Sequence, residues 1–369
     1  MLVQKFLRDN SLETLVEKYG IKVVEHPTDG RVILNYSQID SVKTEPIVME
    51  CRGLVLDKNN NWNVVARSFD RFFNLFEHSE LTDTFDWSDF SCTSKEDGSL
   101  ILFYFYNGEW QINTRGSFAD SICGFSDKTW KELIINLLPN DTSMFLKNFT
   151  YIFEFCSLQN KIVRNYSEPT LYLIGIRDNK NNNDIKNSSL DIEAKHLGLK
   201  RPVSYDFKSL QEIQNFLKQQ ESEDASFEGV VLRDKNGLRM KIKSSTYIAL
   251  HRLRGENNNI FNPKYLIHFV LSGESNELLT YFNEAKDAYY KCEALVHNEL
   301  SNLTDIFLAT KNIEDQKEFA SAVIKKYNTK FPNILFKLKK EFGTQATKEI
   351  LLAIWRDSAD MIYKVIYKK

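Results

Sequence analysis

Apolar runs separated by turn residues fill the chain from about residue 20 to residue 250. Residues 100–106 form one such run, Asn107-Gly108 interrupts it, and residues 109–112 begin the next. Asn-Gly between two strand-like runs is a strong signal for a two-residue β-hairpin. Other strand-like segments, including a second predicted hairpin, lie at residues 151–155, 171–176 and 230–243. The pattern therefore predicts a system of mainly antiparallel β-sheets.

Helical signals are sparser in this first part of the chain. Ser209 and Glu212 have the spacing of a capping box and predict a helix that continues through Leu217. Residues 189–197 predict a second short helix, because Gly198 directly behind them is a typical helix terminator.

Beyond Gly255 glycine and proline become rare, and the pattern changes to that of helices. Apolar residues from Leu278 to Phe307 recur at alternating spacings of three and four, which predicts one long amphipathic helix. A similar pattern between residues 346 and 365 predicts another helix. We therefore expect an α+β domain over residues 1–250 and an all-α domain over residues 251–369.

Composition places the chain among ordinary globular proteins. It has 369 residues, 42% hydrophobic and 27% charged, enough for two or three domain cores. Its longest apolar runs are far shorter than the ~18–20 residues that cross a bilayer, and its first residues resemble no signal segment. Five scattered cysteines without a Cys-x-x-Cys pair predict neither a disulfide framework nor a structural zinc site. We expect a soluble intracellular protein.

Charge is unevenly distributed although the net charge is only −2. Residues 325–369 contain eleven Lys or Arg and four Asp or Glu. Such an excess fits a polyanionic partner, but from charge alone a solvated helical face is the more frequent explanation.

The residues that point to chemistry centre on Lys95-Glu96-Asp97-Gly98-Ser99, directly before a predicted strand. A lysine followed by a carboxylate and a glycine arises easily by chance, so the motif gains weight from its surroundings. In chain order these are Glu50-Cys51-Arg52-Gly53, Arg71-Phe72-Phe73-Asn74-Leu75, Arg115-Gly116-Ser117, Phe153-Glu154-Phe155, Glu228-Gly229 and Lys241-Ile242-Lys243.

This ordered set resembles the covalent nucleotidyltransferase superfamily of ATP-dependent ligases and capping enzymes, in which a lysine in a Lys-x-Asp-Gly motif carries AMP or GMP. The closer resemblance is to the phage RNA ligase 1 family, the type that repairs tRNA. It covers about residues 48–275 motif by motif, and the helical tail only in architecture and length. The resemblance implies a nucleotidyltransferase domain of ATP-grasp-like antiparallel sheets with helices, followed by an all-α C-terminal domain that recognises RNA.

The resemblance also implies ATP and Mg²⁺, or Mn²⁺, as cofactors, and a role for each matching residue. Lys95 would be the nucleophile, and Glu228 a nucleotide contact and metal ligand. The remaining nucleotide-binding positions are Arg52, Arg71, Phe73, Glu96, Gly98, Arg115, Glu154, Gly229, Lys241 and Lys243. Arg52 and Arg71 are expected near the phosphates, Arg115 near ribose or phosphate, and Glu154 at the ribose.

Three positions leave the resemblance open. Arg71 and Arg115 stand where the phage family often has lysine, which keeps the charge but changes the donor geometry. Asn276-Glu277 stands where the family can place a metal-binding carboxylate early in the tail. Phe73 either contacts the nucleotide or is a core residue of its strand.

Lys95 has to be neutral to attack phosphorus, whereas an unperturbed lysine has a pKa of about 10.4. Burial and nearby cations depress a lysine pKa, so we expect such surroundings, with Lys241 and Lys243 as the cations. Residues two apart on a strand share a face, so these two lysines point together while Met240 and Ile242 face a core. A row of lysines protecting an exposed edge strand would give the same spacing.

The predicted function is that of an ATP-dependent RNA ligase that joins 5′-phosphate and 3′-hydroxyl ends through a lysyl-AMP intermediate, in tRNA repair. The expected partners are RNA, namely a tRNA with a broken anticodon loop, and an end-healing kinase or phosphatase. We expect a monomer in the cytoplasm, including that of a phage-infected bacterial cell.

Alternative functions differ in the motifs they need. DNA ligases and capping guanylyltransferases usually append a β-rich barrel, whereas residues 256–369 are predicted to be helical. No Gly-x-x-x-x-Gly-Lys-Ser/Thr loop and no His-Glu-x-x-His helix occurs in the sequence. A catalytically idle RNA-binding scaffold is the alternative from a different class, and the intact set of Lys95, Glu228, Lys241 and Lys243 argues against it.

Overall fold

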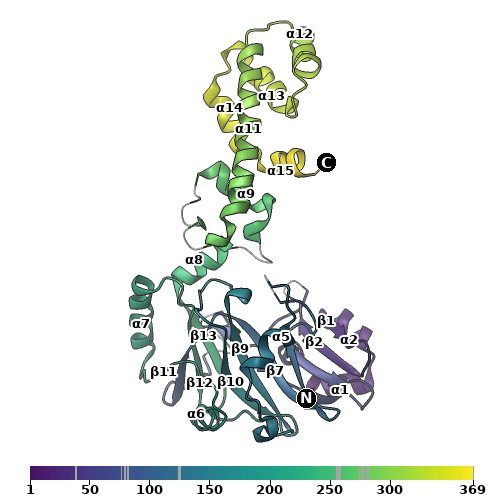
Figure 1. Ribbon diagram of the computed structural model, residues 1–369, viewed down its shortest axis with the longest axis vertical. Helices are drawn as coiled ribbons and strands as arrows, with labels where there is room; N and C mark the ends of the chain where they lie inside the picture. The colour runs from purple at the N-terminus through teal and green to yellow at the C-terminus, as the bar shows by residue number, and fades with distance from the viewer. Residues whose placement is uncertain are drawn as a thin grey trace. The chain divides into compact units, whose positions relative to one another are not determined.

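The computed structural model describes residues 1–37, 40–75, 77–78, 80, 83–123, 126–254, 259–273, 275, 278–279 and 282–368 (Figure 1). The chain divides into two compact units, Met1–Ala249 and Leu250–Lys369. We call them the sheet unit and the helical unit. All three β-sheets belong to the first, and the described residues of the second form helices, so the fold is of the mixed α+β class.

Three sheets build the sheet unit. The first has the order β1-β2-β3-β4, with strands Ile21–Glu25, Arg31–Tyr36, Arg52–Asp57 and Asn63–Ala66. The second has the order β10-β9-β7-β8, with strands Thr170–Asp178, Phe149–Cys156, Ser99–Tyr106 and Glu109–Thr114. The third has the order β11-β6-β12-β13-β5, with strands Ser204–Tyr205, Phe90–Ser94, Gly229–Asp234, Arg239–Lys243 and Phe73–Asn74. Only the β13–β5 pair is parallel.

The helices of the two units follow the same chain order. Those of the sheet unit are α1 (Leu2–Asp9), α2 (Leu12–Tyr19), α3 (Pro46–Glu50), α5 (Trp130–Ile134), α6 (Asn187–His196) and α7 (Leu210–Glu223). Helix α8 (Ser245–Arg254) crosses the division between the units. The helical unit contains α9 (Pro263–Ser272), α11 (Lys286–Thr310), α12 (Gln316–Ser321), α13 (Pro332–Phe342), α14 (Lys348–Arg356) and α15 (Ala359–Tyr367). No described helix is long and apolar enough to span a bilayer.

Both predicted hairpins are confirmed. Asn107 and Gly108 join β7 to β8 with φ angles of 48° and 89°, the positive values that a two-residue turn of this kind requires. Strands β12 and β13 pair from Gly229 opposite Lys243 to Arg233 opposite Arg239. The second hairpin therefore carries the predicted lysine pair.

The alternation along β13 is also confirmed. Met240 is buried and Ile242 packs against the same apolar cluster, while Lys241 and Lys243 face the other side. The strand is not a free edge, because β5 pairs with Met240 and Lys241, and Leu75 N–H donates to the Lys241 carbonyl at 2.9 Å. Protection of an exposed edge does not explain these lysines.

Helix boundaries differ from the predicted ones in three places. Helix α7 extends to Glu223, and its capping box is only half formed, because Glu212 accepts from Lys208 N–H instead of closing on Ser209. The long helix begins at Lys286 after a 3₁₀ turn, since the backbone of Phe282 (φ −123°, ψ 64°) has left the helical region.

The last predicted helix is two helices, α14 and α15. Asp357 caps the end of α14, and the Ser358 hydroxyl donates to the Ile354 carbonyl at 2.6 Å. Short polar side chains of this kind compete with the helical backbone for hydrogen bonds, which explains the break. The apolar spacing on either side does not register it.

Candidate active site

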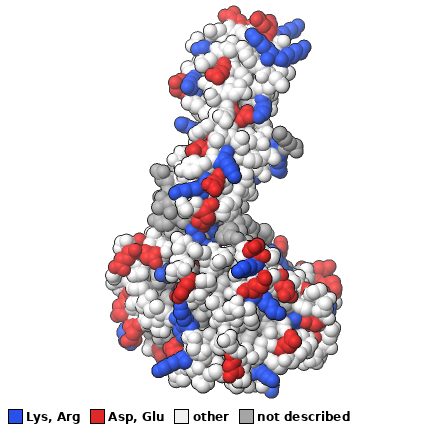
Figure 2. Space-filling view, in the orientation of Figure 1, with Lys and Arg blue, Asp and Glu red and all other residues white. Residues whose placement is uncertain are grey.

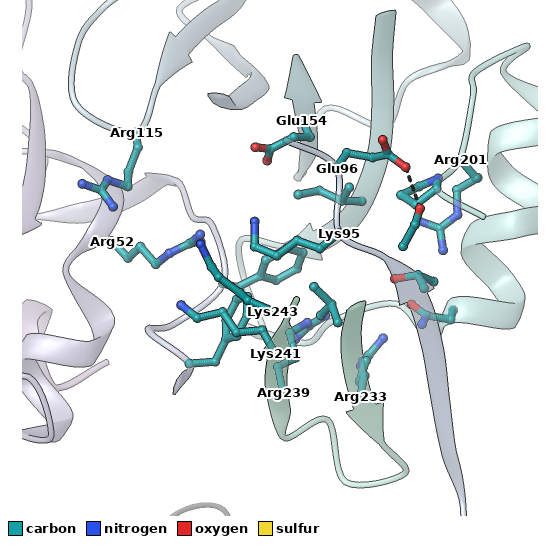
Figure 3. A pocket seen from close by; sticks show the side chains of 18 of the residues that line it. Arg52, Lys95, Glu96, Arg115, Glu154, Arg201, Arg233, Arg239, Lys241 and Lys243 are labelled. Atoms are coloured by element: carbon teal, nitrogen blue, oxygen red, sulfur yellow. Dashed lines mark hydrogen bonds between the residues drawn. The ribbon is translucent and has the colours of Figure 1, made fainter. Parts of the chain in front are cut away.

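Lys95 lies between β6 and β7 and faces a cavity of about 220 Å³ in the sheet unit (Figure 3). All three sheets contribute walls, so the cavity exists only in the folded unit. The lining residues that had been predicted from the sequence are Arg52, Lys95, Glu96, Arg115, Glu154, Lys241 and Lys243. Residues from more than 190 positions of the chain thus converge on one lysine.

Glu228 connects two of the lysines. Its Oε2 lies 2.8 Å from Lys95 Nζ and its Oε1 lies 2.8 Å from Lys243 Nζ. The carboxylate itself is 3% exposed. The Lys95 N–H donates to the Gly229 carbonyl at 2.8 Å, so β12 fixes both the backbone and the side chain of Lys95. This pairing places the amine firmly in the cavity.

The pKa of Lys95 is shifted in the direction opposite to our expectation. Burial lowers it, but the carboxylates of Glu228 and Glu154 outweigh burial and raise the pKa above its ordinary value. The prediction of a depressed pKa is therefore wrong for the ligand-free site. The depressed lysine is Lys241, whose pKa falls to about 8 through burial and the charges of Lys95 and Lys243.

Two glycines of the motifs are required by close approach of the backbone. A Cβ atom on Gly98 would lie 2.2 Å from the Phe155 carbonyl oxygen. A Cβ atom on Gly229 would lie 2.1 Å from the Ile242 carbonyl oxygen, and Gly229 has a φ of 139° that side chains rarely adopt. Both glycines therefore set the geometry on either side of Lys95.

The two acidic residues after Lys95 anchor the loop. Asp97 Oδ2 accepts from the backbone N–H groups of Val163 and Arg164 at 2.8 and 2.7 Å, and Asp97 Oδ1 accepts from the Tyr247 hydroxyl at 2.7 Å. Asp97 is 2% exposed and holds the loop from below. Glu96 lines the cavity, and its carboxylate accepts from the hydroxyls of Ser94 and Tyr166.

Arg52 and Arg115 form one side of the cavity, together with Tyr36 (Figure 3). The Arg115 guanidinium lies 5.5 Å from the Tyr36 ring centre, and the Arg52 guanidinium 5.4 Å from that of Phe72. The Arg52 Nη1 is buried without a hydrogen-bond partner. An unpaired buried donor is costly, which fits an anionic ligand at this position.

Arg71 and Phe73 line a neighbouring cavity rather than the one that Lys95 faces. Arg71 donates to the Tyr36 hydroxyl at 2.9 Å and pairs with Glu77. Phe73 is 3% exposed. Phe72, the residue between them, faces the Lys95 cavity instead. Neighbours on an extended chain point in opposite directions, which was a usable signal for this exchange.

Glu154, on β9, is the other carboxylate of the cavity. Burial raises its pKa to about 7, and the neighbouring Glu228 adds to the rise while Lys95 opposes it. A carboxylate in this state gains from any cation or hydroxyl that enters the cavity.

Several lining residues were not predicted from the sequence: Tyr36, Phe69, Phe72, Asn187, Arg201, Arg233 and Arg239. Arg239 shares the face of Lys241 and Lys243 two residues further along β13, so strand alternation was a signal for it. Arg233 and Arg239 both reach Asp184, which lies in a turn far away in the sequence. Nothing in the local pattern indicates that meeting.

The described residues contain no group of three or more metal-binding side chains. The carboxylates that face the nucleotide cavity or its lysines are Glu154 and Glu228. Mg²⁺ is commonly bound by one or two carboxylates together with substrate phosphates, so this donor set fits a metal that enters with a triphosphate. Asn276 and Glu277 lie outside the described residues.

Comparison with known proteins gives the relationship. The RNA ligase family matches residues 50–247, which is more than half of the chain. The chain belongs to the RNA ligase family. This is the phage RNA ligase 1 type of family to which the motifs around Lys95 pointed.

Relatives in this family match only in part. The chain is 34% identical over 307 residues to a protein named as a bifunctional polynucleotide kinase/RNA ligase of Autographa californica nuclear polyhedrosis virus, covering 77% of this chain and 42% of that protein. It is 26% identical over 163 residues to an RNA ligase of Rhodothermus phage RM378, covering 35% of this chain and 37% of that protein. The chain therefore spans about two fifths of the length of these relatives.

A solved structure of an archaeal ATP-dependent RNA ligase, form 1, is 15% identical and aligns with 76% of this chain and 75% of its own, at a TM-score of 0.49.

Proposed function

We propose that the chain is an ATP-dependent RNA ligase that works through an AMP group carried by Lys95. The observation that carries the proposal is the buried Glu228 carboxylate, which holds both Lys95 and Lys243 at the edge of a cavity rich in cations. A protein that only binds RNA has no need for a lysine held in this way among phosphate-binding side chains. Membership of the RNA ligase family supports the same conclusion.

The first step would be attack of the neutral Lys95 amine on the α-phosphorus of ATP. An N–P bond forms, the bond to the β-phosphate oxygen breaks, and pyrophosphate leaves. Since Glu228 Oε2 already accepts a hydrogen bond from Lys95 Nζ at 2.8 Å, it is placed to hold the departing proton. The positive charges of Arg52, Arg115 and Lys241 would offset the growing negative charge on the phosphates.

Two transfers complete the reaction. A 5′-phosphate oxygen of RNA attacks the phosphorus of lysyl-AMP and releases Lys95. A 3′-hydroxyl then attacks that 5′-phosphate and releases AMP, which leaves a phosphodiester. Mg²⁺ or Mn²⁺, held by ATP and by Glu228, would supply further charge neutralisation on the phosphates. Glu154 would hold the ribose, and the covalent intermediate divides one difficult condensation into easier displacements.

We assign recognition of the RNA to the helical unit. Its last 45 residues carry the excess of basic residues, although the face shown in Figure 2 has acidic side chains between the basic ones. Folded RNA is recognised mostly through its shape and backbone, which suits such a surface. A tRNA with a broken anticodon loop is the proposed substrate. The viral relative is named for a kinase as well as a ligase, which supports an end-healing kinase as partner.

The test is covalent labelling with α-³²P-ATP and Mg²⁺. We expect a labelled protein band, and no band for Lys95→Ala or Lys95→Arg, because a guanidinium stays protonated at neutral pH. Lys208→Ala, at an exposed lysine of the same unit, is the matched control and should label like the wild type. Absence of label in the wild type, or full labelling of Lys95→Ala, contradicts the proposal.

A further inference from the structure

The cavity has two chemically different ends. Figure 3 shows Arg52 and Arg115 on one side of Lys95 and Arg201 on the other. If the phosphates of ATP lie towards Arg52 and Arg115, with the α-phosphorus at Lys95, the nucleobase has to lie towards Arg201. The question is what this end of the cavity offers to a base.

Arg201 presents one fixed, unused hydrogen-bond donor. Its Nε lies 2.9 Å from Asp191 Oδ1, and its Nη1 donates to the Leu173 carbonyl at 2.5 Å. These two contacts lock the planar guanidinium. Its Nη2 is buried and has no hydrogen-bond partner. A donor that is buried, locked and unpaired loses free energy unless a ligand supplies an acceptor.

Asn187 presents an acceptor in the same cavity. The Ser91 hydroxyl donates its single hydrogen to the Arg233 carbonyl at 3.2 Å, so it has to accept from Asn187 Nδ2, which lies 2.7 Å away. This chain of hydrogen bonds fixes the orientation of the amide. The Asn187 Oδ1 is therefore the atom left to accept a hydrogen bond from a ligand.

The walls around these two groups suit a flat ring. Ile174 on β10, Val231 on β12 and Pro202 beside Arg201 all line the cavity. They are apolar and come from two different sheets. A planar base could lie against them with its polar edge towards Arg201 and Asn187.

We infer that Arg201 and Asn187 select adenine, with Arg201 Nη2 donating to ring nitrogen N1 and Asn187 Oδ1 accepting from the N6 amino group. The inference rests on the proposed function, because it takes ATP as the nucleotide. Adenine offers an acceptor next to a donor on this edge, which matches the pair. Guanine in the same position would present an N1–H donor to the Arg201 donor.

ATP analogues that lack single nitrogen atoms test the inference on the intact protein. With 1-deaza-ATP, wild-type kcat/KM for labelling of Lys95 should fall about tenfold to a hundredfold, the usual range for a lost hydrogen bond to a charged group. With 3-deaza-ATP and 7-deaza-ATP it should stay within about threefold of ATP, since those analogues keep N1. A triphosphate of purine riboside, which lacks the N6 amino group, should lose several-fold through Asn187.

Variants show whether the loss passes through Arg201. In Arg201→Gln and Arg201→Lys, ATP and 1-deaza-ATP should label with nearly equal kcat/KM, because the donor to N1 is gone. The lysine variant keeps the charge next to Asp191, so it guards against a glutamine variant that fails to fold. A purely structural role for Arg201 would lower both nucleotides alike and leave their ratio unchanged, which would overturn the inference.

Failure of this inference is distinguishable from failure of the proposed function. A wild-type protein that labels with ATP and equally well with 1-deaza-ATP retains the function and refutes the role of Arg201. Loss with 3-deaza-ATP or 7-deaza-ATP in place of 1-deaza-ATP also refutes it. A wild-type protein that does not label with ATP refutes the function itself.

Discussion

The two units of the chain bury very different side chains. In the sheet unit, the buried charged residues among those described are Arg31, Asp57, Arg67, Glu96, Asp97, Lys161, Arg177, Glu228, Arg233 and Asp234. In the described part of the helical unit, the buried polar side chains are those of Arg254, Thr304 and Thr310. The rest of the helical core is apolar, from Ile260 to Ile362.

The buried polar groups are also satisfied in different ways. Asp184 lies within 4.0 Å of the guanidinium groups of Arg177, Arg233 and Arg239, which come from three different strands. In the helical unit, the hydroxyls of Thr304 and Thr310 donate to carbonyls one turn earlier in their own helix. The first pattern depends on tertiary structure, and the second needs only the helix.

The difference shows where the chain accepts a cost for chemistry. Buried ion pairs often contribute little net stability, because desolvation of the charges offsets their attraction. The sheet unit nevertheless surrounds Lys95 with such pairs, which hold the donors and acceptors in place before a ligand arrives. The helical unit is stabilised by ordinary apolar packing, and only its surface is available for recognition.

The ion pair with the largest expected effect is that of Glu228. Glu228→Gln leaves Lys95 and Lys243 without their charge partner in a buried place, so we expect the free energy of unfolding to fall by about 3 kcal/mol. Labelling of Lys95 should fall by about a hundredfold or more, since the group next to the nucleophile is lost. Denaturant unfolding and α-³²P-ATP labelling measure the two effects.

The matched control is an ion pair on the surface of the helical unit. Lys264 Nζ and Asp360 Oδ1 lie 3.4 Å apart with both side chains more than half exposed. Asp360→Asn should cost at most about 0.5 kcal/mol and leave labelling unchanged. Equal losses in the two variants would remove the distinction between the units.

Glycines sharpen the same comparison. A methyl group on Gly98 would collide with the backbone of Phe155, whereas nothing lies within 4 Å of one on Gly273 at the end of α9. Gly98→Ala should therefore destabilise by about 3 kcal/mol, at the upper end of overpacking effects. Gly273→Ala should cost only about 1 kcal/mol, for its φ of 75°. Thermal or denaturant unfolding of the two variants decides whether the loop at Lys95 is as rigid as its contacts indicate.

The sequence predicts those features that depend on near neighbours. The turn at Asn107-Gly108 and the shared face of Lys241 and Lys243 follow from local backbone geometry, and both are confirmed. Alternation would also have placed Arg239 on the lysine face. These features need no knowledge of which strands lie side by side.

Features that depend on strand order were out of reach. The parallel contact of β5 with β13 places Phe72 in the cavity, and the meeting of Arg177, Arg233 and Arg239 at Asp184 joins segments more than 50 residues apart. Periodicity says which face a residue occupies and leaves its neighbour across the sheet open. The raised pKa of Lys95 was missed for the same reason, because it depends on how closely Glu228 approaches.

A smaller effect is expected from the charges of the helical unit. Lys325, Lys326, Lys337 and Lys340 are exposed. Changing all four to Gln should weaken sealing of a broken stem-loop about tenfold at low salt, because fewer counterions are released on binding. The difference should shrink as salt is raised, and labelling of Lys95 should not change. Equal losses on a stem-loop and on an unstructured oligonucleotide would contradict recognition of folded RNA by this unit.

The smallest expected effect concerns the stability that Lys241 removes from the sheet unit. Its pKa is about 8 in the folded chain, lowered by burial and by Lys95 and Lys243, and near its ordinary value of 10.5 when unfolded. Between these values the unfolded chain binds more protons, so the destabilisation is complete below pH 8 and disappears as the pH rises towards 10.5. Lys241→Met should therefore be more stable than the wild type at pH 7, by an amount that shrinks between pH 8 and pH 10.5, while its labelling of Lys95 is slower. Lys337→Met, at an exposed lysine of the helical unit, is the control and should show no such pH-dependent gain. Urea unfolding of the three proteins at pH 7 and pH 10 measures the difference, and an equal gain for both variants at both pH values would show that Lys241 is not held in the fold against an electrostatic cost.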